Sequence, residues 1–336
     1  MTSYGSECLD TLLGYRSGSD AMVESVVLGS RNRVEHVTLS SGASYVISRW
    51  GELSPDPERR FRRVLQAHDG RFDNCVHFRT PLLYAVDEET RTTAHEYVHR
   101  QPRVSSLSEA CAAFAELHAQ PVTPTLDHSL HAMPQIALWE GLAMSEWQSL
   151  SMGELETWRL IQSQDLREAL VEVLTPAPIV LVHGDASQRN LLVDDTGTVT
   201  IVDWEEFRAG DGARDIGFLF GETLESELRR NLHHVRTARG NITLTNAADS
   251  AVAAAKSIWA QGLTSYCAIR APMDNGFVSR SVRYAGWRLA ESALAEGATR
   301  LRLTADSKAV LGLGLKLLRH PELAGTEFMK MGSLGL

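Results

Sequence analysis

Three oxygen-bearing side chains interrupt the apolar runs of LVHGDASQRNLLVDDTGTVTIVDWEE, residues 181 to 206: Asp185, Asn190 and Asp203. The apolar runs are typical of buried strands, where a carboxylate or an amide is costly unless it is bound or hydrogen-bonded. Asn and Asp supply hard oxygen ligands that suit Mg²⁺, which proteins usually hold with one or two such side chains plus substrate phosphates. With Asn190 and Asp203 on the metal, Asp185 would accept the proton of an attacking hydroxyl.

The spacing supports this division of roles. Five positions separate Asp185 from Asn190, as in the protein-kinase loop H-R-D-x-x-x-x-N, where Asp serves the nucleophile and Asn the metal. Asp203 falls where the metal-binding Asp of D-F-G is expected. The turn signal DDTG lies between NLLV and TVTIV, which predicts a hairpin that presents Asn190 and Asp203 at its two strands.

HGDASQRN followed by IVDWEEFRAGDGARD resembles the aminoglycoside phosphotransferase family, a kinase-like group. The resemblance runs in order from about residue 23 to 220. It implies a catalytic Asp185, and metal ligation by Asn190 and Asp203. It also implies that Asp215 of the G-D-x-x-x-D element hydrogen-bonds the backbone of the catalytic loop. We expect His183 to brace that loop from the core.

The elements around this stretch predict an α+β, bilobal, protein-kinase-like fold. Residues 23–50, 81–86 and 92–98 have strand patterns, and SPDPERRFRRVLQAHDG (54–70) predicts one inserted basic helix. Beyond residue 100 helices are expected at 105–120, 139–150, 153–173, 247–269, 279–299 and 306–319. We therefore expect an antiparallel-sheet, nucleotide-binding N-lobe over 1–98. Residues 99–336 would form a mainly helical C-lobe that carries the catalytic hairpin and the substrate site. The segment SSLSEACAAFAELHAQ also contains Leu117 and His118, which resemble the helix before the catalytic loop in that family.

The nucleotide-binding strand departs from the kinase pattern. Ser48 occupies the position of the Lys that pairs with the α- and β-phosphates. Arg49 is adjacent, but strand alternation sends it to the opposite face unless a bulge turns it inward. Otherwise another cation must serve the phosphates, and Arg31 and Arg33 of the turn LGSRNR are candidates. The backbone around Ser30 could also face phosphate.

Two further positions complete the expected nucleotide site. Glu58, at the start of the basic helix, lies where the partner of the missing Lys would be, although it could be a surface carboxylate. The adenine of ATP (or the guanine of GTP) is expected against the hinge backbone from Glu96 to Val98.

Composition restricts the partners. A formal net charge of −9 and a pI near 5.8 argue against nucleic acid or an anionic membrane, since both need a basic surface. Four dispersed cysteines favour reduced thiols. We see neither a signal peptide nor an apolar run of the roughly 20 residues that a membrane span needs. We therefore expect a cytoplasmic protein.

These observations favour an ATP- (or GTP-) and Mg²⁺-dependent O-phosphotransferase that acts on a hydroxyl of a small molecule such as an antibiotic, in resistance or biosynthesis. Between residues 216 and 300 basic residues at least balance acidic ones, a mild argument against a polycationic aminoglycoside. Gly184 replaces the Arg of H-R-D, and only eleven residues separate Asp203 from Asp215. This predicts constitutive activity without an activation loop.

Two alternatives stay open. The first is a kinase of Ser or Thr in a ribosomal peptide natural-product precursor, for which a peptide substrate and a possible partner protein would be expected. The second is a degenerate kinase-like binding module without chemistry. Ser48 favours this module, whereas the complete set of Asp185, Asn190 and Asp203 opposes it.

Overall fold

The structure is a computed structural model, and it describes residues 22–27 (backbone only), 33–51, 56–99, 106–129, 144–161, 168–169, 177–193, 198–237, 244–271 and 274–325. The chain divides into two compact units. The first comprises Met1–Val104, Thr125–Asp127 and Arg189–Phe207, and the second comprises Ser105–Pro124, His128–Gln188 and Arg208–Leu336. The functional division into lobes at residues 98 and 99 stays a prediction.

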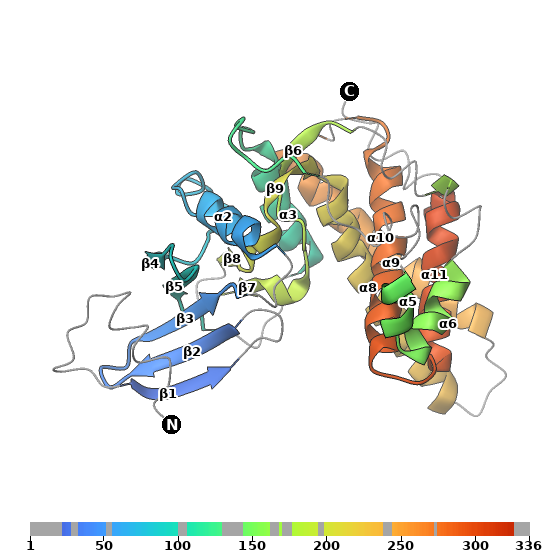
Figure 1. Cartoon of the computed structure of the whole chain (residues 1–336). Helices are drawn as coiled ribbons and strands as arrows, with labels where there is room; N and C mark the ends of the chain where they lie inside the picture. Colours follow the sequence, from blue (N-terminus) through green and yellow to red (C-terminus); the bar gives the residue numbers. More distant parts are fainter. Residues whose placement is uncertain are drawn as a thin grey trace. The chain divides into compact units, whose positions relative to one another are not determined.

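The first unit contains a five-stranded antiparallel sheet in the order β1-β2-β3-β5-β4. Its strands are β1 (Met22–Val27), β2 (Arg33–Leu39), β3 (Ser44–Arg49), β4 (Leu83–Asp87) and β5 (Thr92–Glu96), and β1 to β3 are seen side by side in Figure 1. Val37, Leu39 and Ile47 form a buried cluster within it. In VEHVTL, Val37 and Leu39 lie on the buried face of β2 as alternation expects, but the third buried residue of that face is Glu35, while Val34 is only half-buried.

The rest of the first unit contains helix α2 (Pro57–Ala67) and the expected hairpin. The hairpin consists of β7 (Leu191–Val193) and β8 (Val199–Ile201), and the 3-10 turn η2 (Trp204–Glu206) follows it. Arg79 runs beside β8, where its N–H donates to the Val199 carbonyl at 2.9 Å. An aromatic cluster fixes the turn that follows the hairpin, and its rings are Phe72, Phe78, Trp204 and Phe207.

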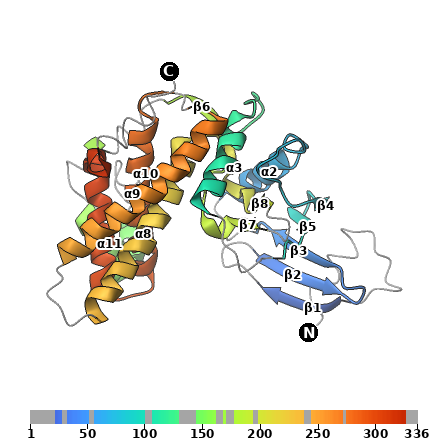
Figure 2. The ribbon, with the colours of Figure 1, turned by 180° about the vertical axis from the view of Figure 1, so that it is seen from behind.

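The second unit is mainly helical. Its helices are α3 (Leu107–Ala119), α5 (Met144–Ser149), α6 (Met152–Ile161), α8 (Ala213–Thr237), α9 (Leu244–Ile269), α10 (Phe277–Ala298) and α11 (Ala305–Arg319), with the 3-10 turn η3 (Pro321–Ala324) after α11. A two-stranded sheet pairs β6 (Ile179–Val182) with β9 (Arg208–Asp211). Ser106 and Glu109 form a capping box at the start of α3, within the helix expected at 105–120. Figures 1 and 2 show α8, α10 and α11 packed as neighbours.

These elements confirm the predicted α+β class, with an antiparallel sheet toward the N-terminus and helices beyond it. Two expected helices, at 139–150 and 153–173, lie only partly in the described residues: α5 falls within the first range, α6 begins one residue before the second, and 139–143, 162–167 and 170–173 lie outside the described residues. The sequence analysis missed α8, the 25-residue helix that begins within the G-D-x-x-x-D element. Among the described helices, none combines the length and the apolar character that crossing a bilayer requires.

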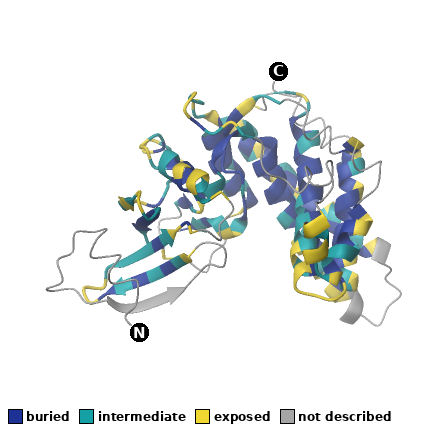
Figure 3. Ribbon diagram, viewed as in Figure 1, coloured by how far each residue is buried: buried dark blue, intermediate teal, exposed yellow. Residues whose placement is uncertain are grey.

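Close approach of α8 to α10 explains why α8 was missed. A Cβ at Gly217 would lie 2.4 Å from both the Ser281 carbonyl oxygen and the Tyr284 Cβ, and one at Gly221 would lie 2.7 Å from the Arg288 Cβ. Glycine lowers helix propensity, so these two positions weaken the helical pattern while they allow the two backbones to pack. Figure 3 shows that the first turns of α8 are almost wholly buried.

We predict that Gly217→Ala destabilises the protein by at least about 2 kcal/mol, because the added methyl group must displace the α10 backbone. Gly312→Ala on α11 is the matched control: Gly312 is exposed, and no atom lies within 4 Å of its added Cβ. It should stabilise by about 0.5–1 kcal/mol through helix propensity. Urea denaturation of the three proteins measures both effects. Equal stability of G217A and the wild type would show that α8 and α10 do not pack this closely.

Candidate active site

The loop that follows β6 is held by a buried carboxylate. Asp215, near the start of α8, has no solvent exposure. Its Oδ2 accepts the His183 N–H at 2.8 Å, and its Oδ1 accepts the Gly184 N–H at 2.9 Å. Gly184 has φ of 85°, a left-handed conformation that favours glycine. The resemblance implied that Asp215 bonds this backbone, and the two hydrogen bonds are present.

The same helix holds the loop from a second side. Arg214 donates from Nε to the Gly184 carbonyl at 3.0 Å, while its guanidinium lies 4.2 Å from the centre of the Phe218 ring. Two turns later, Glu222 accepts the Ser187 hydroxyl at 2.7 Å and the Gln188 N–H at 2.8 Å. Sequence reasoning missed Arg214 and Glu222. The position of Glu222 could have indicated its role: it lies seven residues after Asp215, and residues seven apart share a face of a helix.

Asp185 lies in the middle of this loop and is half-buried. The charge of Arg288, on α10, acts on it and on Glu222 and Glu291, and its guanidinium binds Glu222 at 3.0 Å. Burial alone would lower the pKa of Arg288, but the charges of Glu291, Glu222 and Asp185 raise it above its ordinary value. Burial also raises the pKa of Glu291, against the opposing effect of Arg214 and Arg288. The expected general base therefore lies among paired charges.

Asp215 also belongs to a buried polar network with His118 and Tyr266. His118 of α3 bonds through Nε2 to Asp215 Oδ2 at 3.2 Å and through Nδ1 to the Tyr266 hydroxyl at 3.0 Å. Burial would raise the pKa of Asp215, but hydrogen bonds and charges, that of His118 first, hold it below its usual value. His183 is fully buried, as expected of a bracing residue. Its ring lies 6.2 Å from that of Phe114.

The hairpin of the first unit brings Asn190 and Asp203 together. Leu191 pairs with Ile201, and the Val202 N–H donates to the Asn190 carbonyl at 2.9 Å. Asn190 and Asp203 therefore stand at the same end of the hairpin. Asp203 is exposed and has φ of 67°, a strained conformation that is often found at functional sites.

This donor set fits Mg²⁺. An amide oxygen and a carboxylate are hard ligands, and phosphate oxygens of a nucleotide and water would complete the coordination. In the part of the chain that the structure describes, no three His, Cys, Asp or Glu side chains are grouped so that they could hold a metal ion by themselves. A site with two protein ligands does not depend on such a group. Metal binding by Asn190 and Asp203 stays a prediction.

The structure also places the expected nucleotide residues of β3. The β2–β3 and β3–β5 registers are continuous, so no bulge turns Arg49 inward, and its side chain is exposed. Ser48 is half-buried opposite Thr93. Ser30 and Arg31 lie outside the described residues. Arg33 forms an ion pair with Glu35.

The other expected nucleotide contacts have partners within the protein. Glu58 is exposed and bonds Arg62 at 2.7 Å. Glu96 binds Arg79 at 2.6 Å and accepts the Leu82 N–H at 3.2 Å. Val98 is buried. Their roles toward a nucleotide stay predictions.

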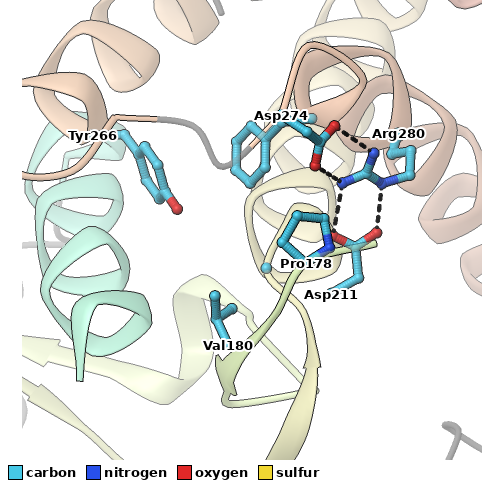
Figure 4. Close-up of a pocket in the computed structure, with 8 residues that line it drawn as sticks. Pro178, Val180, Asp211, Tyr266, Asp274 and Arg280 are labelled. Atoms are coloured by element: carbon cyan, nitrogen blue, oxygen red, sulfur yellow. Dashed lines mark hydrogen bonds and ion pairs between the residues drawn. The ribbon is translucent and has the colours of Figure 1, made fainter. Parts of the chain in front are cut away.

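Asp211, the first acid of G-D-x-x-x-D, ties β9 to α10. Arg280 lies between Asp211 and Asp274 and bonds them at 2.7 Å and 2.8 Å (Figure 4). A small pocket adjoins this ion pair, lined also by Pro178, Val180, Tyr266 and Phe277. The two carboxylates raise the pKa of Arg280 against the effect of its burial. This arrangement anchors the end of β9 from which α8 starts.

The fold, with its antiparallel sheet and helical part, is that of a kinase-like phosphotransferase. Residues 26–247 match the phosphotransferase enzyme family (APH), and the chain belongs to this family. A sequence comparison with curated proteins finds no match.

Solved structures show the same fold at low identity. The aminoglycoside phosphotransferase APH(2'')-Ib with bound ADP is 13% identical with a TM-score of 0.53, over 95% of this chain and 99% of that one. The amicoumacin kinase hAmiN, in complex with AMP-PNP, Ca²⁺ and Ami, is 12% identical with a TM-score of 0.52, over 94% and 92%. The spectinomycin phosphotransferase APH(9)-Ia is 13% identical with a TM-score of 0.51, over 98% and 96%. At these identities the likeness establishes the fold alone.

We predict that Asp215→Asn costs about 2–4 kcal/mol of unfolding free energy at pH 7, because a charged acceptor is lost from a buried network. The folded pKa of Asp215 lies below its unfolded value of about 3.9. The contribution of the Asp215 charge to the free energy of unfolding is thus complete above the unfolded pKa and is lost as the pH falls through the folded pKa. The stability difference between wild type and D215N should therefore shrink below about pH 4.

Denaturant titrations of both proteins from pH 3 to pH 7 measure this difference. Asp249→Asn, at an exposed position of α9, is the control and should change stability by no more than about 0.5 kcal/mol. A D215N curve that runs parallel to the wild type through acid would contradict the assignment.

Proposed function

We propose that this chain is a nucleotide- and Mg²⁺-dependent O-phosphotransferase, with ATP (or GTP) as donor and a hydroxyl of a small molecule as acceptor. One observation carries the proposal: two backbone hydrogen bonds to buried Asp215 hold the loop of Asp185, and the hairpin presents Asn190 and Asp203 at one end. Membership of the phosphotransferase family supports the reaction class. The nucleotides bound to the kinases of similar fold support the donor.

Each residue has a distinct task in the proposed reaction. Asp185 orients the acceptor hydroxyl and takes its proton as the oxygen attacks the γ-phosphoryl group. Asn190 and Asp203 would hold Mg²⁺, which neutralises charge on the phosphates when it is bound. Asp215, Arg214 and Glu222 keep the loop in place, since phosphoryl transfer depends mainly on positioning and electrostatics.

Paired charges on α8 and α10, of which Glu222 contacts the loop, favour a neutral or weakly charged acceptor over a polycation. Among the described residues of α8 and α10, the carboxylates of Glu222, Glu225 and Glu227 bond arginines at 2.6–3.0 Å. A polycationic aminoglycoside would need carboxylates in excess of cations. We therefore infer an antibiotic of low charge, a sugar or an amino alcohol as the acceptor. The hydroxyl of Ser or Thr in a peptide is the alternative.

Ser48 favours one rival of a different class, a binding module without chemistry. A kinase-like strand without its Lys lacks one cation for the phosphates. Such a module would bind nucleotide weakly or not at all. Nucleotide binding and turnover therefore separate the two functions.

We predict that Asp185→Ala lowers the rate of phosphoryl transfer by about 10²–10⁴, the usual contribution of a general base. The rate is measured as ATP or GTP consumption with Mg²⁺ against a panel of hydroxyl compounds and Ser/Thr peptides. Asp249→Ala, at the exposed α9 position, should match the wild type. Equal rates for D185A and the wild type would refute the assignment of the base.

Thermal melting with nucleotide tests the binding step independently. A ligand of the folded state at 100 times its Kd stabilises by about 2.7 kcal/mol, so millimolar ATP or GTP with Mg²⁺ should raise the Tm. An unchanged Tm with all four of ATP, ADP, GTP and GDP would favour the binding module.

A further inference from the structure

The residues directly after Asp203 are held by helix α2. Arg60 forms an ion pair with Glu205 and bonds Glu206 at 2.6 Å. Arg63, one turn later, donates to Glu206 at 3.2 Å and to the Glu205 carbonyl at 3.3 Å. Two residues one turn apart on α2 therefore bond the turn η2. Asp203 is the residue directly before this turn.

The contacts lie in a protected environment. The side chains of Arg60 and Glu205 are 13% and 14% exposed, and that of Arg63 is 6% exposed. Trp50 donates its indole N–H to Glu205 at 3.1 Å, and Asp127 accepts two bonds from Arg63 at 2.6 Å and 2.9 Å. Ion pairs with this degree of burial and two or more hydrogen bonds each are more strongly coupled than exposed pairs.

This arrangement inverts the charges that a kinase-like helix usually presents. In the usual pattern a helix carboxylate pairs with the strand Lys. Here Ser48 replaces the Lys, and the helix carboxylate Glu58 is exposed and bonded to Arg62. The buried side of α2 carries arginines instead, and their partners are acids of the D-W-E-E segment.

Two guanidinium groups hold this segment through several contacts. Arg60 and Arg63 bond three carboxylates, those of Asp127, Glu205 and Glu206. The turn η2 is therefore tied to helix α2 at both of its glutamates.

We propose that Arg60 and Arg63 are positioning residues for the metal site: through Glu205 and Glu206 they fix the turn that sets Asp203. The inference rests on the proposed function, since it assumes that Asp203 binds Mg²⁺. It goes further in one respect. The contacts of Arg60 and Arg63 with Glu205 and Glu206, which we call the clamp, would couple helix α2 to the site, as a Lys–Glu pair does in the usual kinase pattern.

The test compares Arg60→Met with Arg62→Met. Arg62 lies on the same helix, but its side chain is 72% exposed and bonds Glu58, so R62M is the matched control. Isothermal titration gives the Kd of ADP with MgCl₂ and with EDTA. We expect R60M to raise the Kd in MgCl₂ by about 10- to 100-fold, as for groups that orient metal ligands, and to change little in EDTA. R62M should match the wild type in both.

Two further variants sharpen the comparison. Arg60→Lys should lie between wild type and R60M, because an ammonium group cannot make paired bonds to both glutamates. Glu205→Gln and R60M should combine less than additively, since they break the same contact. Without nucleotide, hydrogen exchange of the amides of residues 204–207 should rise in R60M and stay unchanged in R62M.

The outcomes separate this inference from the proposed function. If Asp203→Asn removes the effect of Mg²⁺ while folded R60M and E205Q retain it, the clamp is overturned and the metal site stands. If Mg²⁺ does not strengthen ADP binding to the wild type, or if D203N leaves its effect intact, the metal site fails and the clamp with it. Should R60M not fold, R60K and E205Q give the same comparison.

Discussion

The buried carboxylate of Asp215 is the constraint on which the second unit depends. A charge without solvent exposure is costly unless hydrogen bonds and opposite charges offset its desolvation. Here two backbone N–H groups and His118 supply those partners. The partners in turn fix the loop: Gly184 must adopt a positive φ, and the chain must leave β6 in the one direction that points both amides at the carboxylate. Asp185 follows directly, so its place is set by an interaction in which it takes no part.

Helix α8 converts that single contact into a rigid support. Arg214, Asp215 and Glu222 reach the loop at its carbonyl, its amides and its C-terminal residues. The helix is itself located by backbone packing at Gly217 and Gly221 against α10. Main-chain contacts have little freedom to rearrange, so α8 is fixed against α10. The loop that α8 holds is therefore fixed in position as well. In the proposed reaction the general base must lie within hydrogen-bonding reach of the proton it accepts, and this support would hold Asp185 in such a position.

Local patterns predicted the parts of the structure whose partners are near in sequence. Strand patterns predicted the strands of the sheet, DDTG predicted the hairpin, and the pattern of residues 105–120 predicted α3. The contact from Asp215 to the loop was also expected, although only through resemblance. The helix α8 was missed because two packing glycines weaken its pattern, and whether a glycine serves packing or ends a helix is decided by a distant neighbour.

Long-range charge contacts were the least predictable. The sequence predicts a basic helix over residues 54–70, and it singles out Glu58 as the residue of this helix with a possible role in nucleotide binding. In the structure Glu58 is exposed, whereas Arg63 is buried. Arg63 bonds Asp127, which lies 64 positions further along the chain. Neither composition nor spacing records such a pairing, since it depends on which face of α2 meets η2.

The use of arginine links the two supports. In a kinase-like strand one Lys does two things, because it contacts the phosphates and it pairs with the helix. In the proposed clamp the second task would belong to guanidinium groups, whose planar fork can bond two carboxylates at once, as Arg60 does with Glu205 and Glu206. An ammonium group could not bridge such a pair with the same geometry. If the clamp holds the turn, the strand position would have only the phosphates left to serve. Ser48 at that position would then cost the nucleotide a cation without loosening the turn that carries Asp203.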